Sequence, residues 1–228
     1  GNDAANILVT GGTWNVTIPA SASNFNICSS APFYNMNILK AGAGAGVVTL
    51  ANQTIGPNVV EVYRPTPVLA QPLVVLNDLN IVTGNAPNLS AGISNVVVGR
   101  NFNIQTSTTY TPGTNTTIFN GALNQSFIVN GTINTALNNL TLQKPLQRTL
   151  SISGAAATIA VNGTLSLFVG TLADGGKIIN VNGDIINSGN HSGLGSIRLT
   201  GAGAQNIGGD GSGKFNNLIL NKTTGSTT

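Results

Sequence analysis

One nine-residue phrase occurs three times in this sequence, and its recurrence limits the folds that the chain can adopt. Residues 136–144 and 214–222 share Asn-Asn-Leu at their centre and Lys at their end, and residues 32–40 repeat the same pattern. Two further short apolar stretches precede each copy. A unit that recurs as one short apolar strand after another is typical of a solenoid, in which each copy buries its apolar face only by stacking on the next.

A shorter regularity lies inside the long one. Single apolar residues recur at intervals close to 21 positions, and they are Val75, Val98, Phe119, Leu140, Val161 and Val181. Asn-Gly pairs follow two of them, at 162–163 and 182–183, and such a pair tolerates the left-handed backbone of a sharp corner. The spacing therefore predicts a coil of about 21 residues per turn, with one kind of corner repeated in each turn and roughly ten turns in all. Asparagines on successive corners are expected to hydrogen bond along the stack.

The chain lacks any helical period of 3.6 residues, and turn residues separate its short apolar stretches. With the coil period, this predicts an all-β protein, a right-handed parallel β-helix that forms a single domain over residues 1–228. Proline cannot donate to a β-ladder, so irregular loops are predicted near residues 63–72 and 106–117. The first long unit, from Met36 to Leu140, is longer than the second and is expected to carry about one extra turn.

Both ends of the sequence fall inside a repeat, which would leave strand edges open. The expectation is a segment of a longer repeat protein or a filament subunit that stacks end to end. The lone cysteine, Cys28, excludes an internal disulfide and any cysteine-based metal site.

Residues 201–209, Gly-Ala-Gly-Ala-Gln-Asn-Ile-Gly-Gly, and the strand at 215–220 resemble the repeat of large secreted parallel β-helix proteins of Bacteroidota-type bacteria. The phrase at 161–167 is similar to their strand-corner-strand pattern. The resemblance covers most of residues 115–228 and, loosely, the first half, which departs through its proline-containing loops. It implies an extracellular or cell-surface location, since many of these proteins end in a sorting domain for type IX secretion, which this sequence lacks. It brings no catalytic residues.

Charged residues make up 7% of the chain, against about 25% in a typical soluble domain. A polar and nearly uncharged surface favours an extracellular scaffold. The nine basic residues are scattered, whereas a nucleic-acid footprint would cluster them, so no nucleic acid is expected as a partner. No run of about 18 apolar residues occurs, so membrane insertion is not expected.

The six acidic residues give no convincing catalytic pair, because glycoside hydrolysis needs two carboxyl groups about 5 to 10 Å apart. Asp78 and Asp184 are predicted at equivalent corners five turns apart. Asp174 precedes two glycines and is predicted in a turn, and His191, the only histidine, is predicted on a surface loop. Calcium binding at 208–213 and ice binding by threonines are disfavoured, because neither motif recurs at the required spacing. No catalytic residue, metal or cofactor is expected.

Two functions follow from these observations. The first is a non-catalytic structural or adhesive module of an extracellular or cell-surface protein, a stalk or filament segment that associates end to end or with further repeats of its own chain. The alternative is a carbohydrate-binding or polysaccharide-active β-helix protein. In that case Tyr63, Arg64 and Tyr110, which lie beside prolines in the two predicted loops, would contact a surface glycan.

Overall fold

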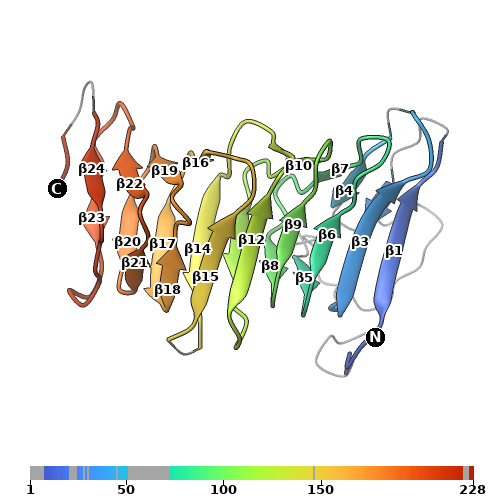
Figure 1. Ribbon diagram of the computed structural model, residues 1–228, viewed down its shortest axis with the longest axis horizontal. Coiled ribbons are helices and arrows are strands. Elements are labelled where there is room, and N and C mark those ends of the chain that lie inside the picture. Colours follow the sequence, from blue (N-terminus) through green and yellow to red (C-terminus); the bar gives the residue numbers. More distant parts are fainter. Residues whose placement is uncertain are drawn as a thin grey trace, which may run out of the picture.

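The computed structural model describes residues 8–20, 25–27, 29, 31–44, 46–50, 72–145, 147–222 and 226–228. Within these residues the chain is all β, contains no helix, and forms a parallel β-solenoid of about eight turns (Figure 1). Accordingly, no helix that could cross a membrane is found in the described ranges. The predicted class of an all-β parallel β-solenoid is confirmed, and the number of turns is smaller than predicted.

Each turn of the coil contributes one strand, or in the first and last turns an isolated bridge, to each of three faces. Sheet A is the first face and contains β1 (Thr13–Ile18), β3 (Asn35–Lys40), β6 (Leu79–Ile81), β9 (Phe102–Ile104), β12 (Gln125–Val129), β15 (Thr149–Ser153), β18 (Thr171–Ala173) and β21 (Asn190–Ser192). The next face is divided between two sheets. Sheet B contains β2 (Phe25–Ile27), β4 (Val48–Leu50), β7 (Asn88–Ser90), β10 (Thr109–Thr111) and β13 (Thr132–Ile133), and sheet D contains β16 (Thr158–Val161), β19 (Ile178–Val181), β22 (Ser196–Leu199) and β24 (Leu218–Leu220). Sheet C completes the turn with β5 (Leu73–Val75), β8 (Val96–Val98), β11 (Thr116–Phe119), β14 (Asn139–Gln143), β17 (Leu165–Val169), β20 (Ile185–Asn187) and β23 (Ile207–Gly208).

Residues one turn apart lie directly above one another, as the period predicts. Val161 pairs in parallel register with Val181. The length of a turn varies because the corners differ in length. Ile178 pairs with Ser196, 18 residues later, whereas Leu140 pairs with Leu165, 25 residues later. The predicted 21 residues lies between these values.

The predicted single column is in fact two columns on different faces. Val75, Val98 and Phe119 stack in sheet C, whereas Val161 and Val181 stack in sheet D. The prediction of one repeated corner was wrong because every corner of a three-sided coil joins two apolar strands through a short polar turn. Local sequence therefore does not tell one corner from another.

The recurring phrase also falls on a different face each time it occurs. Its central residue is Met36 in β3 of sheet A, Leu140 in β14 of sheet C and Leu218 in β24 of sheet D. Eleven strand steps separate the first two copies, and eleven separate the last two when the bridge of Lys214 to Asn190, which continues sheet A, is counted. Three strands make one turn, so eleven steps fall one strand short of four turns and each copy begins one face earlier in the coil.

The predicted extra turn in the first unit is therefore wrong. β1, β3 and β6 are direct neighbours in sheet A, and no described strand lies between them. The additional residues fall between β4 and β5, where 51–71 lie outside the described residues. The predicted irregular loop at 63–72 is almost wholly in this stretch.

The second predicted loop, at 106–117, is a regular part of the coil. It contains β10, which pairs with β7 on one side and β13 on the other. Pro112 follows the strand at a corner, where its missing N–H removes no ladder hydrogen bond. The prediction failed because it took one proline as evidence that the whole stretch is irregular, whereas the proline affects only the corner in which it lies.

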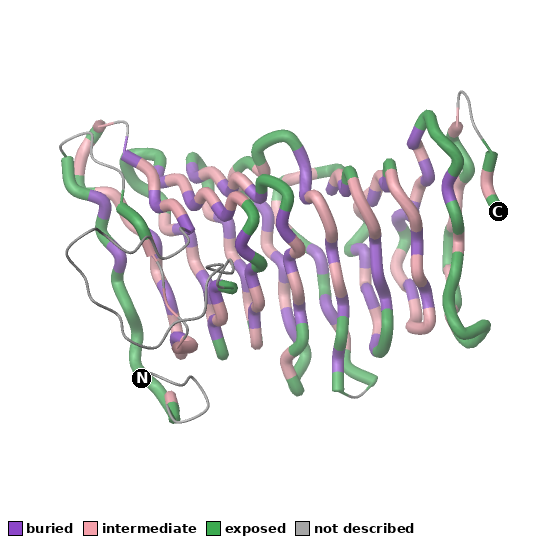
Figure 2. Tube along the Cα trace, turned by 180° about the vertical axis from the view of Figure 1, so that it is seen from behind, coloured by how far each residue is buried: buried purple, intermediate pink, exposed green. Residues whose placement is uncertain are grey.

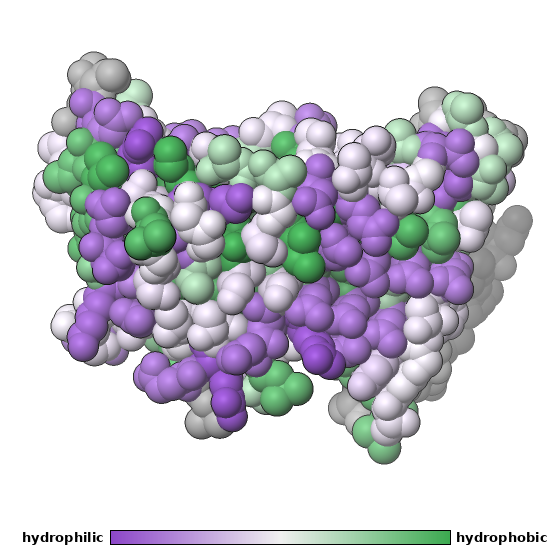
Figure 3. Space-filling model, viewed as in Figure 1, coloured by the Kyte–Doolittle hydropathy of each residue, from purple (hydrophilic) through white to green (hydrophobic). Residues whose placement is uncertain are grey.

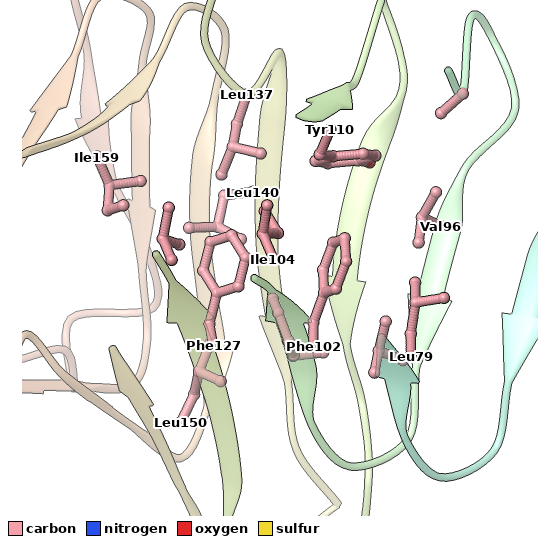
Figure 4. Packing of buried hydrophobic residues seen from close by; sticks show 14 of the residues in the cluster. Leu79, Val96, Phe102, Ile104, Tyr110, Phe127, Leu137, Leu140, Leu150 and Ile159 are labelled. Carbon is pink, nitrogen blue, oxygen red and sulfur yellow. The ribbon is translucent and has the colours of Figure 1, made fainter. Parts of the chain in front are cut away.

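Inward residues alternate with outward ones along most strands, and the inward residues form a continuous apolar core (Figure 2). Aromatic rings fill its middle turns, where Phe102 packs on Phe127 with ring centroids 5.5 Å apart (Figure 4). One corner requires glycine, because a Cβ on Gly121 would collide with the carbonyl oxygen of Gly99 one turn away.

Asparagine side chains form the predicted ladders along the coil. On sheet A, Asn37 Nδ2 donates to Asn15 Oδ1 at 2.8 Å, and Asn80 Nδ2 donates to Asn37 Oδ1 at 3.0 Å. At a corner, Asn182 Nδ2 donates to Asn162 Oδ1 at 2.9 Å. These bonds run parallel to the coil axis and add side-chain links to the backbone ladder.

Candidate functional site

Tyr110 does not lie where the glycan-binding prediction requires it. Its side chain is in the core, 0% exposed, with its ring centroid 5.1 Å from that of Phe102. Its Oη lies 3.0 Å from Thr117 Oγ1 and accepts a hydrogen bond from Asn115 Nδ2 at 3.2 Å. Burial raises the pKa of Tyr110 to about 12.

A ring enclosed in this way cannot stack on a sugar, so the prediction for Tyr110 is wrong. The strand alternation explains its position, since Thr109 and Thr111 face outward and Tyr110 between them faces inward. The other two predicted contact residues, Tyr63 and Arg64, and the lone Cys28 lie outside the described residues.

Asp78 and Asp184 lie at different corners, contrary to the prediction. Asp78 precedes β6 of sheet A, and Asp184 precedes β20 of sheet C. Each carboxylate accepts a hydrogen bond from the next turn. Asp78 Oδ1 accepts from Asn101 Nδ2 at 2.9 Å, and Asp184 Oδ1 accepts from the backbone N–H of Asn206 at 2.8 Å. Both acids therefore link turns of the coil.

The buried pair of Asp174 and His191 is the feature closest to an active-site arrangement. Asp174 follows β18, and His191 is the central residue of β21, which stacks on β18. His191 Nε2 lies 2.9 Å from Asp174 Oδ2, and both side chains are fully buried. The prediction of a surface histidine was wrong, because His191 occupies an inward position of a short strand.

The other carboxylate oxygen of Asp174 is engaged by the backbone. Asp174 Oδ1 accepts hydrogen bonds from the N–H groups of Gly176 at 2.7 Å and Gly195 at 3.0 Å. The first of these bonds is the turn predicted from Asp-Gly-Gly. The second comes from the next turn of the coil, so Asp174 ties two turns together through both of its oxygens.

Burial lowers the pKa of His191, although the hydrogen bond and negative charge of Asp174 act in the opposite direction. His191 Nδ1 is buried and has no hydrogen-bond partner in the described part of the chain. The neutral ring with its proton on Nε2 fits this geometry, because a proton on Nδ1 would be buried without an acceptor. No described hydroxyl or thiol is hydrogen bonded to the pair, so it lacks the nucleophile of a catalytic triad.

Two lysines at the end of the recurring phrase have their ammonium groups enclosed by carbonyl oxygens. Lys144 Nζ donates to the backbone oxygens of Gly121 at 3.1 Å and Leu123 at 2.8 Å, and to Gln125 Oε1. Three acceptors match the three N–H bonds of an ammonium group. Burial lowers the pKa of Lys144 to about 8, so the ammonium form still predominates at neutral pH.

Lys222 repeats this arrangement on another corner of the coil. Its Nζ donates to the backbone oxygens of Gly201 at 2.8 Å and Gly203 at 2.7 Å, and to Gln205 Oε1 at 2.7 Å. We call each lysine, its glutamine and the two backbone oxygens a Lys–Gln cage.

The glutamine of each cage fastens the cage to a third turn. Gln125 Nε2 donates to the backbone oxygens of Val98 and Arg100, each at 2.8 Å. Gln205 Nε2 donates to the backbone oxygen of Val181 at 3.1 Å and to that of Gly183. Each cage therefore joins three successive layers of a corner.

The Lys–Gln cages escaped the sequence analysis, although a signal for them exists. Gly-x-x-x-Gln occurs at 121–125 and again at 201–205, in each case ahead of the recurring phrase that ends in lysine. The described residues contain no group of three or more His, Cys, Asp or Glu side chains that could hold a metal ion.

Comparison with models of protein families, with curated proteins and with solved structures found no match to this chain. The fold and its buried groups define the class of protein. It is a parallel β-solenoid in which buried ionisable side chains connect one turn to the next.

Proposed function

We propose that the chain is a non-catalytic structural or adhesive module of an extracellular or cell-surface protein. It acts as a stalk or filament segment, built as a right-handed parallel β-helix. The observation that carries the proposal is that the polar groups of Lys144, Asp174 and His191 join turns of the coil. A catalytic site would aim such groups at a substrate.

The links act along the axis of the coil, which is the direction that a stalk must support. Each Lys–Gln cage holds three layers, and each asparagine ladder holds neighbouring turns. A hydrogen bond contributes about 0.5–1.5 kcal/mol net, and one to a charged group about 1.5–3 kcal/mol. Because a slip of one turn against the next breaks many such bonds together, the coil resists shear and bending.

The surface is suited to an environment outside the cell. In Figure 3 the hydrophobic residues of the viewed face are scattered among hydrophilic ones, and only 7% of the chain is charged. Uncharged amide and hydroxyl groups keep their hydrogen bonding over a wide range of salt, because screening acts on charges. The partners proposed for such a module are further coils of the same kind, and surface glycans are the ligand proposed for the adhesive form.

The test is a search for turnover of polysaccharides by the purified chain. The scaffold proposal expects no new reducing ends and no unsaturated products from a panel of neutral and acidic polysaccharides. Turnover that disappears in Asp78→Asn or Asp184→Asn would overturn the non-catalytic assignment. Glycan-array binding lost in Tyr63→Ala or Arg64→Ala would instead favour the carbohydrate-binding alternative.

A further inference from the structure

Three inward-facing aromatic residues lie at the β1 end of the coil, one on each face. Trp14 occupies an inward position, since it pairs with the buried Met36, yet it is 61% exposed. Phe25 pairs with the buried Val48 and is 45% exposed. Phe33 completes the set, with its ring centroid 5.2 Å from that of Trp14. We call Trp14, Phe25 and Phe33 the first-coil plate.

The opposite end of the coil has a second apolar surface. Leu218 and Leu220 pair with the buried Ile197 and Leu199 and therefore face inward, yet Leu220 is 60% exposed. Phe215 packs against the same end of the core. We call Phe215, Leu218 and Leu220 the last-coil plate, and none of the residues in the two plates carries a charge.

The sequence repeat shows what normally covers such a surface. Leu140 and Leu142 are the equivalents of Leu218 and Leu220 in the preceding copy of the phrase, and both are buried. They are covered by β17, a parallel strand whose inward residues Leu165 and Leu167 pair with them. The surface is thus complementary to a parallel strand with apolar residues at alternate positions.

The same comparison applies to the first-coil plate. Trp14 pairs with Met36 as Thr117 pairs with Leu140 in the next copy. Thr117 is fully buried beneath Val96 of β8, again an apolar residue of a parallel strand. Both plates are therefore surfaces that another coil of this architecture covers elsewhere in the same chain.

We propose that the last-coil plate of one molecule stacks on the first-coil plate of a second copy, so that chains associate head to tail. The proposal rests on the scaffold function and names its partner. β1 pairs only with β3 and β24 only with β22 among the described residues, so each has one edge open for a ladder. The end coils present their three faces in the same order, and a second copy placed head to tail keeps every strand parallel.

An interface that joins two different surfaces of one molecule leaves a free copy of each surface at the ends of the assembly. It therefore extends into a filament unless the rotation closes a ring. Head-to-head contacts between identical plates would instead place the strands antiparallel and would stop at a dimer. The two arrangements predict different behaviour in mixtures of variants.

Sedimentation velocity of the 228-residue chain over a wide range of concentration tests the proposal. The wild-type chain is expected to form a concentration-dependent series of oligomers. Trp14→Lys and Leu220→Lys should each weaken association by about tenfold or more, because each buries a charge in an apolar contact. Ile93→Lys is the matched control. Ile93 is 61% exposed in the corner between β7 and β8, away from both plates, so this change should leave association unaltered.

A mixture of the two plate variants separates head-to-tail from head-to-head association. Trp14→Lys retains an intact last-coil plate and Leu220→Lys an intact first-coil plate, so the mixture should form a one-to-one dimer and nothing larger. Oligomers that persist in both single variants would overturn the assignment of the surfaces. A wild-type chain that stays monomeric with an intact β-sheet circular dichroism spectrum would overturn self-association and leave the scaffold proposal standing. Polysaccharide turnover would instead overturn the scaffold proposal and leave self-association standing.

Discussion

His191 Nε2 lies 2.9 Å from Asp174 Oδ2 between two adjacent turns of the coil, with both side chains removed from solvent. Asp174 also receives backbone hydrogen bonds from its own turn and from the next. His191, in contrast, has one ring nitrogen without a hydrogen bond, because its Nδ1 has no partner among the described residues. Burial therefore favours the neutral form of His191, and substitution of either residue tests what the pair contributes to stability.

Stability should fall with acidification because of His191. Burial lowers the pKa of His191 below its ordinary 6.5, so the folded chain favours the neutral ring more than the unfolded chain does. As pH falls through about 6.5, the unfolded chain binds a proton that the folded chain resists, and stability is lost. Between about pH 7.5 and pH 5, the urea concentration at the midpoint of unfolding should fall as the pH falls. This midpoint should depend less steeply on pH in His191→Gln. Equal slopes for the two proteins would contradict this account.

Removal of the Asp174 carboxylate should lower the unfolding free energy more than its replacement by a neutral amide. Asp174→Ala leaves the N–H groups of Gly176 and Gly195 and the ring of His191 without their acceptor, and should cost about 3–5 kcal/mol of unfolding free energy. Asp174→Asn keeps one acceptor oxygen and should cost about 1–3 kcal/mol. Denaturant unfolding measures both values, and similar losses in the two variants would show that these hydrogen bonds matter little.

The two Lys–Gln cages provide an internal comparison. Lys144→Met removes three hydrogen bonds, of which Gln125 Oε1 alone keeps another described donor, the N–H of Gly121, and the change should reduce the unfolding free energy by about 1–3 kcal/mol. Lys222 is only partly buried, so water can replace it and Lys222→Met should cost less. A double-mutant cycle of Lys144→Met with Gln125→Leu should give a coupling energy of about 0.5–3 kcal/mol. Additive losses would show that the cage does not act as a unit.

Close packing at one corner should make a single methyl group destabilising. Gly121→Ala directs its Cβ into the backbone oxygen of Gly99 and should cost about 2 kcal/mol or more. Gly203→Ala is the control, because a Cβ there meets no atom within 4 Å. Its effect should be within about 0.5 kcal/mol. Thermal or denaturant unfolding compares the two, and a tolerated Gly121→Ala would mean that the corner can relax.

Much of the architecture could be predicted from short-range patterns. Alternation of apolar and polar residues specified strands, and the interval between Val161 and Val181 specified that one lies on the other. The turn at Asp174 and the asparagine ladders followed from the preferences of a few neighbouring residues. These features depend on strand geometry and on a period that is repeated many times, so single irregularities do not obscure them.

The sequence by itself determined that the chain coils in parallel strands, while the tertiary structure decided which face each strand occupies. Face assignment depends on the summed lengths of all preceding corners, so the recurring phrase moves from sheet A to sheet C to sheet D although its pattern of apolar and polar residues stays the same. The same dependence hid the burial of His191 and the cages of Lys144 and Lys222. Their hydrogen-bond partners lie 17 to 23 residues away and meet them only when whole turns are stacked.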